Sequence, residues 1–276
     1  MIILYNKNIL SNRLIYLRKL LRRKDINIHK LEPDIYKYIS LAHSWSYIRY
    51  IRRLYTYIKY NNIKVKISSN NYISRYKYES SLYSIQALLD SFYINDHIFI
   101  PTVVPGHGAG YYNINKEFSI YNFSAIAALY YRKKYKKILI LDLDIHNGVG
   151  TIDIIKNKKN IYYISLFSKI SCNIKYNYNN VYNFLLDPGI DNNIYIKLFE
   201  NHVISLINSI DPDIIITSLG FDAHKDDKYS SINIDFDVYN YIFSYLRSFD
   251  KILYILEGGY NKEIIYNGTK LLLKNG

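Results

Sequence analysis

Residues 138–151 read ILILDLDIHNGVGT, a short apolar run followed by polar residues from Asp142 onward. The run Lys137–Leu141 is continuously apolar after its first residue, whereas a half-exposed strand would alternate. This pattern is typical of a parallel strand buried on both faces. Open α/β sheets place their ligand sites at the carboxyl ends of such strands. The stretch therefore predicts a fold class and also the edge of the sheet where chemistry takes place.

Similar apolar runs recur through the last two thirds of the chain, at Ile98–Val104, Ile161–Leu166, Asp213–Leu219 and Lys251–Leu256. Helical stretches separate them, at Phe123–Tyr131, Ile194–Ser209 and Phe236–Phe249. Strands that alternate with helices predict a parallel sheet covered by helices on both faces. We found no repeat and no linker, so residues 1–276 are expected to form a single three-layer α/β domain with a mostly parallel, multi-stranded sheet.

The first part of the chain has a different, helical pattern. Residues 10–23 carry leucines at helical spacing and predict an amphipathic helix. A longer helical region runs to about Tyr60, with Ser44 as the expected N-cap of its second part. Residues 61–75 are rich in Asn and Ser and are expected to form a loop, and Tyr78–Phe92 is expected to be another helix.

The positive charge of the protein is confined to this first part. Residues 1–80 carry 17 Lys and Arg against 4 Asp and Glu, and the remaining chain carries 19 of each. Such basic runs are able to bind nucleic acid or another anionic partner. Solvated helix faces explain them more simply. We therefore expect no nucleic-acid partner and keep this function as the weakest alternative.

Cysteine content and hydropathy bear on the compartment. Cys172 is the sole cysteine, so no intrachain disulfide and no cysteine-based zinc finger is expected. No apolar run approaches the roughly 18 residues of a membrane span. The basic N-terminus has the composition of a transit peptide, but its leucine stripe favours a packed helix. We predict a cytoplasmic protein, or a nuclear one in a eukaryotic cell, with no membrane partner.

Chemically capable residues follow four of the predicted strands. They are His107, the group Asp142, Asp144 and His146, then Asp222 with His224, and finally Glu257 with Tyr260. Because parallel strands end at the same edge of a sheet, we expect these side chains to converge.

Asp144, His146 and Asp222 predict a metal site. On an extended strand end, residues two apart point to the same side, so Asp144 and His146 would face one ion together. Three protein ligands with an open fourth position describe catalytic zinc, and the same donors suit Fe²⁺ or Mn²⁺. Alternatively, Asp144 and His146 cap the following helix and bind only its backbone.

The motifs resemble those of the histone deacetylase, acetylpolyamine amidohydrolase and acetoin utilization protein superfamily, which has the arginase–deacetylase fold. The stretch Ile138–Thr151 is similar to its metal-binding strand and turn. Gly220–His224 and Leu256–Tyr260 are similar to its two downstream signatures, in the same order. The loop Pro105–Ala109 resembles its histidine-pair loop, and Ala42-His43-Ser44 resembles the start of an N-terminal helix. The resemblance implies one histone deacetylase-like domain over residues 1–276.

Carried over by position, the resemblance assigns roles to individual residues. Asp144, His146 and Asp222 match the zinc ligands, and Tyr260 matches the tyrosine that stabilises the oxyanion. His107 matches the first histidine of the pair, and Asp142 matches its carboxylate partner. Phe118 matches an aromatic wall of the acyl-lysine tunnel, and Gly259 belongs to the substrate-binding signature. A structural K⁺ is implied at the backbone carbonyls of five residues, Asp142, Asp144, His146, Ser165 and Leu166.

The sequence departs from the family pattern at the general base. The family has a second histidine where this chain has Gly108, and an orienting Asp or Asn where this chain has Val149. Asn147 and Glu117 replace a frequent histidine and a glycine. A shift of one residue in the alignment would instead place His107 in the position of the base.

The resemblance implies a zinc-dependent deacetylase or amidohydrolase acting on an acetylated lysine, in a peptide or protein, or on an acetylpolyamine. The losses at Gly108 and Val149 leave an alternative open, a catalytically impaired relative that binds acylated ligands.

His43 and His224 are expected to be hydrogen-bonded structural residues.

Overall fold

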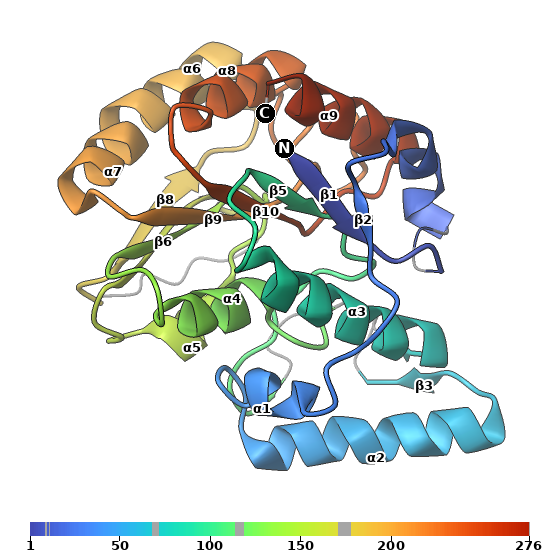
Figure 1. Cartoon of the computed structure of the whole chain (residues 1–276). Coiled ribbons are helices and arrows are strands. Elements are labelled where there is room, and N and C mark those ends of the chain that lie inside the picture. The colour runs from blue at the N-terminus through green and yellow to red at the C-terminus, as the bar shows by residue number, and fades with distance from the viewer. Residues whose placement is uncertain (9, 11, 68–71, 114–118, 171–177, 276) are drawn as a thin grey trace.

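The structure is a computed structural model that describes residues 1–8, 10, 12–67, 72–113, 119–170 and 178–275. Its centre is an eight-stranded sheet in the order β2-β1-β5-β10-β9-β6-β7-β8, and every neighbouring pair is parallel (Figure 1). The strands are β1 Ile2–Tyr5, β2 Ile26–Asn27, β5 Ile98–Ile100, β6 Ile138–Asp142, β7 Ile161–Ser168, β8 Val181–Leu186, β9 Ile214–Leu219 and β10 Ile252–Leu256.

Helices cover both faces of the sheet, as Figure 1 shows. One layer contains α1 Ile35–Ile39, α2 Trp45–Asn61, α3 Arg75–Ser91, α4 Phe123–Tyr131 and α5 Val149–Ile155. The other contains the 3₁₀ helix η1 Asn12–Leu20, α6 Asn192–Leu198, the π-helical turn η2 Phe199–Ile204, α7 Ser205–Ile210, α8 Phe236–Leu246 and α9 Lys262–Asn275. The predicted three-layer α/β architecture with helices on both faces is confirmed.

The central strands are mostly apolar on both faces because a separate core lies under each helical layer. In β6, Ile138 and Ile140 belong to the core under α3 and α4, while Leu139 and Leu141 belong to the core under α8 and α9. Successive side chains of a strand point to opposite faces, so a strand buried on both sides loses its alternation.

The structure adds strands that the sequence pattern did not identify. The edge strand β8 has four partly exposed residues between buried ends, so it lacks a continuous apolar run. The start of the chain, Ile2–Tyr5, is strand β1. The predicted strand Ile98–Val104 was too long, since β5 ends at Ile100. Pro101 follows directly and has no N–H to offer the ladder.

The helical predictions for the first part need two corrections. Residues 10–23 do not form an α-helix; the chain forms the 3₁₀ helix η1, and the three-residue spacing of Leu14, Leu17 and Leu20 matches its period. The expected loop 61–75 contains a short antiparallel hairpin, β3 Val65–Lys66 and β4 Tyr72–Ile73.

Serine caps set the starts of the two long helices in this part. Ser44 caps α2, as predicted, and its Oγ accepts from Tyr47 N at 3.2 Å. Ser74 caps α3 in the same way, so α3 begins three residues before the predicted start at Tyr78.

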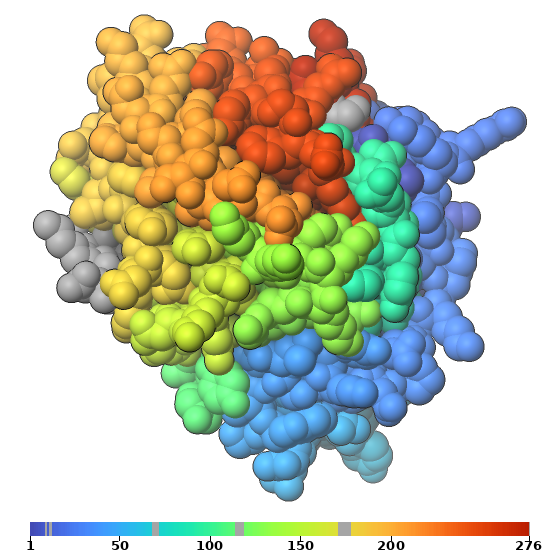
Figure 2. Space-filling view, turned by 60° about the vertical axis from the view of Figure 1, so that its left-hand side comes forward, coloured from blue at the N-terminus to red at the C-terminus, as the bar shows by residue number. Residues whose placement is uncertain are grey.

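The N-terminal third occupies its own side of the molecule. In Figure 2 these residues, coloured blue to light blue, form the right-hand and lower sides of the face in view, while the C-terminal residues lie at the top. The excess positive charge of residues 1–80 is therefore concentrated on one side.

Candidate metal centre

The order of the sheet brings the chemically capable residues together. β5, β10, β9 and β6 are consecutive neighbours, and the segments after their carboxyl ends carry His107, Tyr260, Asp222 and Asp144. Residues separated by more than a hundred positions therefore share one edge of the sheet, where open α/β folds place their ligand sites.

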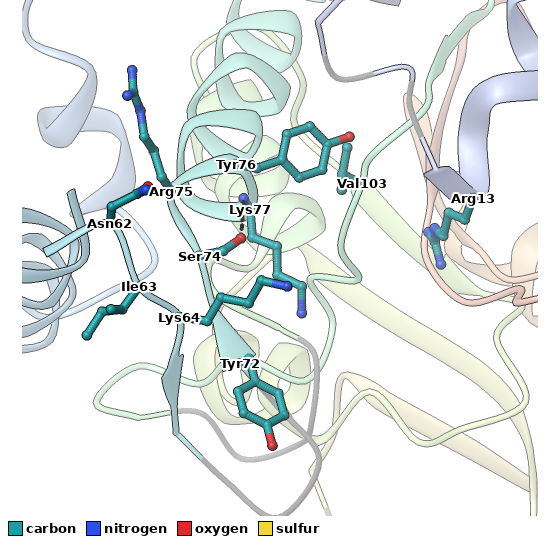
Figure 3. A pocket seen from close by; sticks show the side chains of 10 residues that line it. All are labelled: Arg13, Asn62, Ile63, Lys64, Tyr72, Ser74, Arg75, Tyr76, Lys77 and Val103. Carbon is teal, nitrogen blue, oxygen red and sulfur yellow. Dashed lines mark hydrogen bonds between the residues drawn. The ribbon is translucent and has the colours of Figure 1, made fainter.

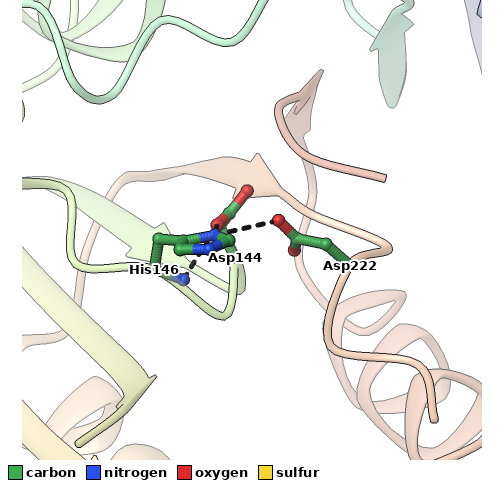
Figure 4. Close-up of side chains that lie close together, drawn as sticks. All are labelled: Asp144, His146 and Asp222. Atoms are coloured by element: carbon green, nitrogen blue, oxygen red, sulfur yellow. Dashed lines mark hydrogen bonds and ion pairs between the residues drawn. The ribbon is translucent and has the colours of Figure 1, made fainter. Parts of the chain in front are cut away.

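Asp144, His146 and Asp222 form a compact group of potential metal ligands (Figure 4). The Nδ1 of His146 lies 3.0 Å from Asp144 Oδ1 and 3.1 Å from Asp222 Oδ2. One ligand atom from each residue lies within 4.8 Å of the other two. Both carboxylates are buried, and His146 is partly exposed. Two carboxylates and an imidazole are a donor set that zinc accepts.

Backbone contacts hold these ligands in place. Asp144 Oδ2 accepts from Gly258 N at 2.7 Å, and Asp222 Oδ1 accepts from Ile145 N at 3.3 Å. A Cβ at position 258 would lie 2.0 Å from Asp222 Oδ2 and 2.5 Å from Asp144 Oδ2. Glycine at this position therefore lets the β10 segment approach both carboxylates.

The electrostatics of the group favour a bound cation. Burial and the charge of Asp144 raise the pKa of the Asp222 carboxyl to about 6. Burial opposes a charge on His146, but hydrogen bonds to Asp144 and Asp222 raise the pKa of its imidazole to about 10. Two buried carboxylates side by side are costly without a compensating positive charge. The residues present thus fit a divalent metal.

The prediction that strand alternation aligns Asp144 with His146 was wrong. Asp144 and His146 lie in the turn after β6, which ends at Asp142, so strand alternation does not align them. The capping alternative is contradicted as well, because the N-cap of α5 is Gly148 and makes no side-chain cap. Asp144 instead accepts from His146 N at 2.9 Å and binds the β10 segment.

His107 lies next to the metal group and pairs with Asp142. The distance from His107 Nδ1 to Asp142 Oδ2 is 3.0 Å, and the distance from His107 Nε2 to Asp144 Oδ1 is 3.8 Å. Burial opposes protonation of His107, but the charges of Asp142 and Asp144 raise its pKa well above the ordinary value. The contact with Asp142 is the one that the resemblance predicted for the first histidine of the pair.

Two further residues complete the surroundings of His107; the sequence did not identify Tyr163, and it identified Glu257 without giving it a role. The hydroxyl of Tyr163 on β7 donates to Asp142 Oδ2 at 2.7 Å. Glu257 Oε2 accepts from His107 N at 3.2 Å. Tyr163 lies in an apolar strand whose sequence gives no indication of a functional residue. Glu257 lies in the recognised motif Leu256–Tyr260, but no role was assigned to it.

Tyr260 is positioned by the segment that carries Asp227 and Tyr229 and by the turn at Gly259. Asp227 Oδ2 accepts from Tyr260 N at 2.7 Å, and the ring of Tyr229 packs edge-on with centroids 4.6 Å apart. Gly259 has φ of 115°, a conformation that favours glycine and turns the chain sharply before Tyr260. Burial, together with the charge of Asp222, raises the pKa of the Tyr260 phenol far above its usual range.

Arg13 joins the N-terminal helix η1 to the Tyr260 segment. Its Nη1 donates to Gly259 O at 3.0 Å, its Nη2 donates to Glu257 O at 2.6 Å, and its guanidinium lies 5.7 Å from the centre of the Tyr260 ring. The sequence offered no means of separating Arg13 from the other basic residues of the first third.

Position 108, where the resemblance leads one to expect a second histidine, is a glycine in this chain. Gly108 N donates to Ser119 Oγ at 3.2 Å, and Val149 is the first residue of α5. Asn147 is buried, and its amide atoms have no hydrogen-bond partner among the described residues. Phe118 and Glu117 lie outside the described residues.

The other singled-out histidines behave as structural residues, as predicted. His43 Nδ1 lies 2.8 Å from Gly110 O, and its Nε2 accepts from Asn122 N at 2.9 Å. His224 Nδ1 accepts from Asp226 N at 3.2 Å. The predicted K⁺ site remains a prediction. Two of its residues, Asp142 and Ser165, are register partners on β6 and β7.

Comparison with known proteins agrees with this fold. A histone deacetylase domain model matches residues 8–275. An uncharacterised protein of Synechocystis is 30% identical over 206 residues, which cover 68% of this chain and 66% of that protein. Histone deacetylase 15 of Arabidopsis thaliana is 30% identical over 186 residues, which cover 62% of this chain and 34% of that protein. The chain thus spans less than two thirds of either relative.

Two solved structures share the fold. The HD domain of HDA15 superposes with a TM-score of 0.86 at 21% identity, covering 99% of this chain and 88% of that one. The acetylpolyamine aminohydrolase from Burkholderia pseudomallei superposes with a TM-score of 0.79 at 14% identity, covering 100% and 98%.

The fold and the Asp144–His146–Asp222 group define an α/β protein of the arginase–deacetylase class with residues able to hold a metal ion. Within that class, the chain belongs to the histone deacetylase domain family. None of the described helices is long and apolar enough to span a membrane.

Proposed function

We propose that this protein is a zinc-dependent deacetylase that removes the acetyl group from an N-acetylated amine, either an acetyl-lysine of a peptide or protein or an acetylpolyamine. The observation that carries the proposal is the convergence of Asp144, His146 and Asp222 beside both His107 and Tyr260. Membership of the histone deacetylase domain family supports this reaction class.

Asp144, His146 and Asp222 would hold the metal, with Zn²⁺ preferred and Fe²⁺ an alternative for the same donors. When bound, such an ion polarises a carbonyl and lowers the pKa of a coordinated water. The two buried carboxylates would supply the negative charge that binds the cation, and Gly258 N would orient Asp144 through its hydrogen bond. The K⁺ near Asp142 is also a proposal.

Tyr260 would donate a hydrogen bond to the oxyanion that develops on the acetyl carbonyl. Its raised pKa keeps the phenol protonated at neutral pH, so the hydroxyl is available as a donor. One oxyanion donor is typically worth about 3 kcal/mol in the transition state. The sharp turn at Gly259 and the contact of Asp227 with Tyr260 N would fix where the phenol points.

His107 would carry out the proton transfer that this chain can still perform. Its Nδ1 is committed to Asp142, so Nε2 is the nitrogen that faces the metal group. The matching second imidazole is missing at Gly108. General acid–base help is usually worth about 10²–10⁴-fold, so we expect a slow enzyme.

The substrate would enter beside the Tyr260 segment. Gly259 and Phe118 are the proposed substrate-binding residues, and both acetyl-lysine and acetylpolyamine remain candidates. We also propose a cytoplasmic location.

The decisive experiment is turnover by the purified, zinc-loaded protein. An acetyl-lysine peptide and N-acetylputrescine are offered separately, with and without chelator, and His146→Ala serves as the matched inactive control. We expect slow release of acetate that the chelator and the variant both abolish. No acetate release from either substrate despite bound zinc would contradict the enzyme proposal.

The losses at Gly108 and Val149 favour one other candidate, a protein that keeps the pocket and binds acylated ligands without hydrolysing them. Binding of the same acetylated peptide to zinc-loaded but inactive protein, lost in His146→Ala, would favour that function.

A further inference from the structure

A second cavity lies outside the metal centre, between the N-terminal turn of α3 and the helix η1. Its volume is about 630 Å³, within the range of small-molecule sites. Basic side chains from three separate segments line it, namely Arg13, Lys64, Arg75 and Lys77, and no acidic residue lines it among those that the structure describes. The rings of Tyr72 and Tyr76 form parts of its wall (Figure 3).

Of these cations, Arg75 is already neutralised. Its Nε lies 2.8 Å from Glu79 Oε1, one helical turn further along α3. Lys64 and Lys77 form no ion pair with any residue in the part of the chain that the structure describes. In Figure 3 the Lys77 side chain extends from α3 and the Lys64 side chain from the segment between α2 and β3, both toward the space that faces Arg13.

The three remaining cations repel one another. Burial lowers the pKa of Lys77, and the positive charges of Arg13 and Lys64 lower it further. Arg13 uses its hydrogen bonds on the neutral carbonyl oxygens of Thr102, Glu257 and Gly259. Its Nε has no partner among the described residues. Arg13 also has carboxylates nearby, those of Asp222, Glu257 and Asp144, whereas the charges that act on Lys77 are both positive. The cavity thus gathers Lys64 and Lys77 beside Arg13, and like charges held together in this way cost free energy unless an anion binds between them.

A phosphate group matches the ammonium and guanidinium groups around this cavity better than other anions do. Ammonium groups on flexible stems bind phosphate oxygens as point charges, and a guanidinium adds donors in a fixed fork. The first turn of the 17-residue helix α3 also borders the cavity, so its positive dipole end adds to the field of the cations. Three cations on separate segments require a ligand that carries more than one charge.

We propose that this cavity binds a small molecule that bears at least two phosphate groups, held by Arg13, Lys64 and Lys77. The inference is independent of the proposed deacetylase function, since none of the metal-centre residues lines this cavity. The bound anion would lie next to the Tyr260 segment, because Arg13 contacts both.

The test is calorimetric titration of the zinc-loaded protein with fructose 1,6-bisphosphate at physiological salt, which screens weak surface binding. We expect one site, with affinity lowered about tenfold or more in Lys64→Ala/Lys77→Ala. Lys197→Ala is the matched control, since it removes an exposed lysine of α6 in the opposite helical layer. Tricarballylate, a tricarboxylate, should bind more weakly than the bisphosphate.

Thermal unfolding separates a lost site from a damaged fold. Without ligand, Lys77→Ala should melt at the same temperature as wild type or higher, because a repelled cation is removed. With ligand, wild type and Lys197→Ala should gain stability, and the double variant should not. Equal affinity in wild type and double variant, or no binding to wild type, would overturn the proposal. Equally tight binding of tricarballylate would overturn the assignment to phosphate.

Discussion

The metal side and the proton-transfer side of the candidate site keep very different amounts of the family pattern. On the metal side Asp144, His146 and Asp222 are all present and close together. On the other side His107 retains its carboxylate, while Gly108 and Val149 stand where an imidazole and its partner would be expected.

The difference shows which parts of the site are tied to the fold. The metal ligands are held by the backbone of neighbouring strand segments, so replacing one disturbs buried charge. The loop after His107 is held separately, since Gly108 N donates to Ser119 Oγ and not to a proposed metal ligand. The following predictions test whether the two sides are separable in this way.

The largest effect is expected from removing a metal ligand. Asp222→Ala should lower zinc affinity by more than about 100-fold, since even residues that only support ligands cost about 10–100-fold. Zinc retained after dialysis, measured by atomic emission, gives the answer, and Asp226→Ala is the exposed control on the same segment. Unchanged zinc content in Asp222→Ala would show that Asp222 is not a metal ligand, and the contrast between the metal side and the proton-transfer side would no longer hold.

Tyr260→Phe should lower the turnover rate about 10²–10³-fold while leaving zinc content unchanged, because only the oxyanion donor is deleted. The rate with acetyl-lysine peptide and the bound zinc are measured on the same preparation. A parallel loss of zinc would show that Tyr260 supports the fold of the site instead.

Restoring the proton-transfer side should raise the turnover rate appreciably only when both Gly108 and Val149 are replaced. Gly108→His with Val149→Asp should raise the turnover rate at least about tenfold above wild type, and more than the two single changes combined. An imidazole without a carboxylate partner lacks its orientation, so each single variant should gain little. If wild-type turnover is measurable and none of the variants changes it, His107 serves as the base by itself.

The last prediction concerns the stability of the fold and its pH dependence, and it involves His43, which contacts the loop after His107. Burial lowers the pKa of His43 to about 4, and both of its ring nitrogens are used by Gly110 O and Asn122 N. The unfolded state binds this proton first, so the free energy of unfolding should fall as the pH drops from about 6.5 to 4, by roughly 3 kcal/mol.

Urea unfolding across this pH range measures the fall, and His43→Gln should show a shallower dependence. An identical slope in both proteins would contradict the assignment of the effect to His43.

The central sheet could be predicted from the sequence because parallel strands that are buried on both faces consist of short, nearly continuous apolar runs. The runs around Ile140, Ile216 and Ile255 are apolar on both faces, and the structure places each of them in the middle of the sheet. The edge strand β8 escaped prediction because its exposed residues break the run. The helix η1 was misjudged because a spacing of three to four residues does not distinguish a 3₁₀ helix from an α-helix.

For the site, short motifs identified the residues that converge at the candidate metal centre, and they failed for the residues that hold them in place. Asp144 and Asp222 stand in recognisable patterns at strand ends. Tyr163, Asp227 and Arg13 bind these patterns from distant segments, and their partners are set by tertiary packing. Nothing in their local sequence distinguishes them from ordinary aromatic, acidic or basic residues.

The hydrogen bond between Arg13 and Gly259 spans 246 positions of the chain. During synthesis, residue 13 emerges early, whereas two of the three carbonyls that its guanidinium binds, those of Glu257 and Gly259, are made 244 and 246 residues later. Until then its guanidinium lacks these partners, and the Tyr260 turn cannot be held in place. The closure of such a long loop makes completion of the candidate site a late event, so a ribosome that stops before β10 releases a chain with most of its strands and an incomplete candidate metal centre.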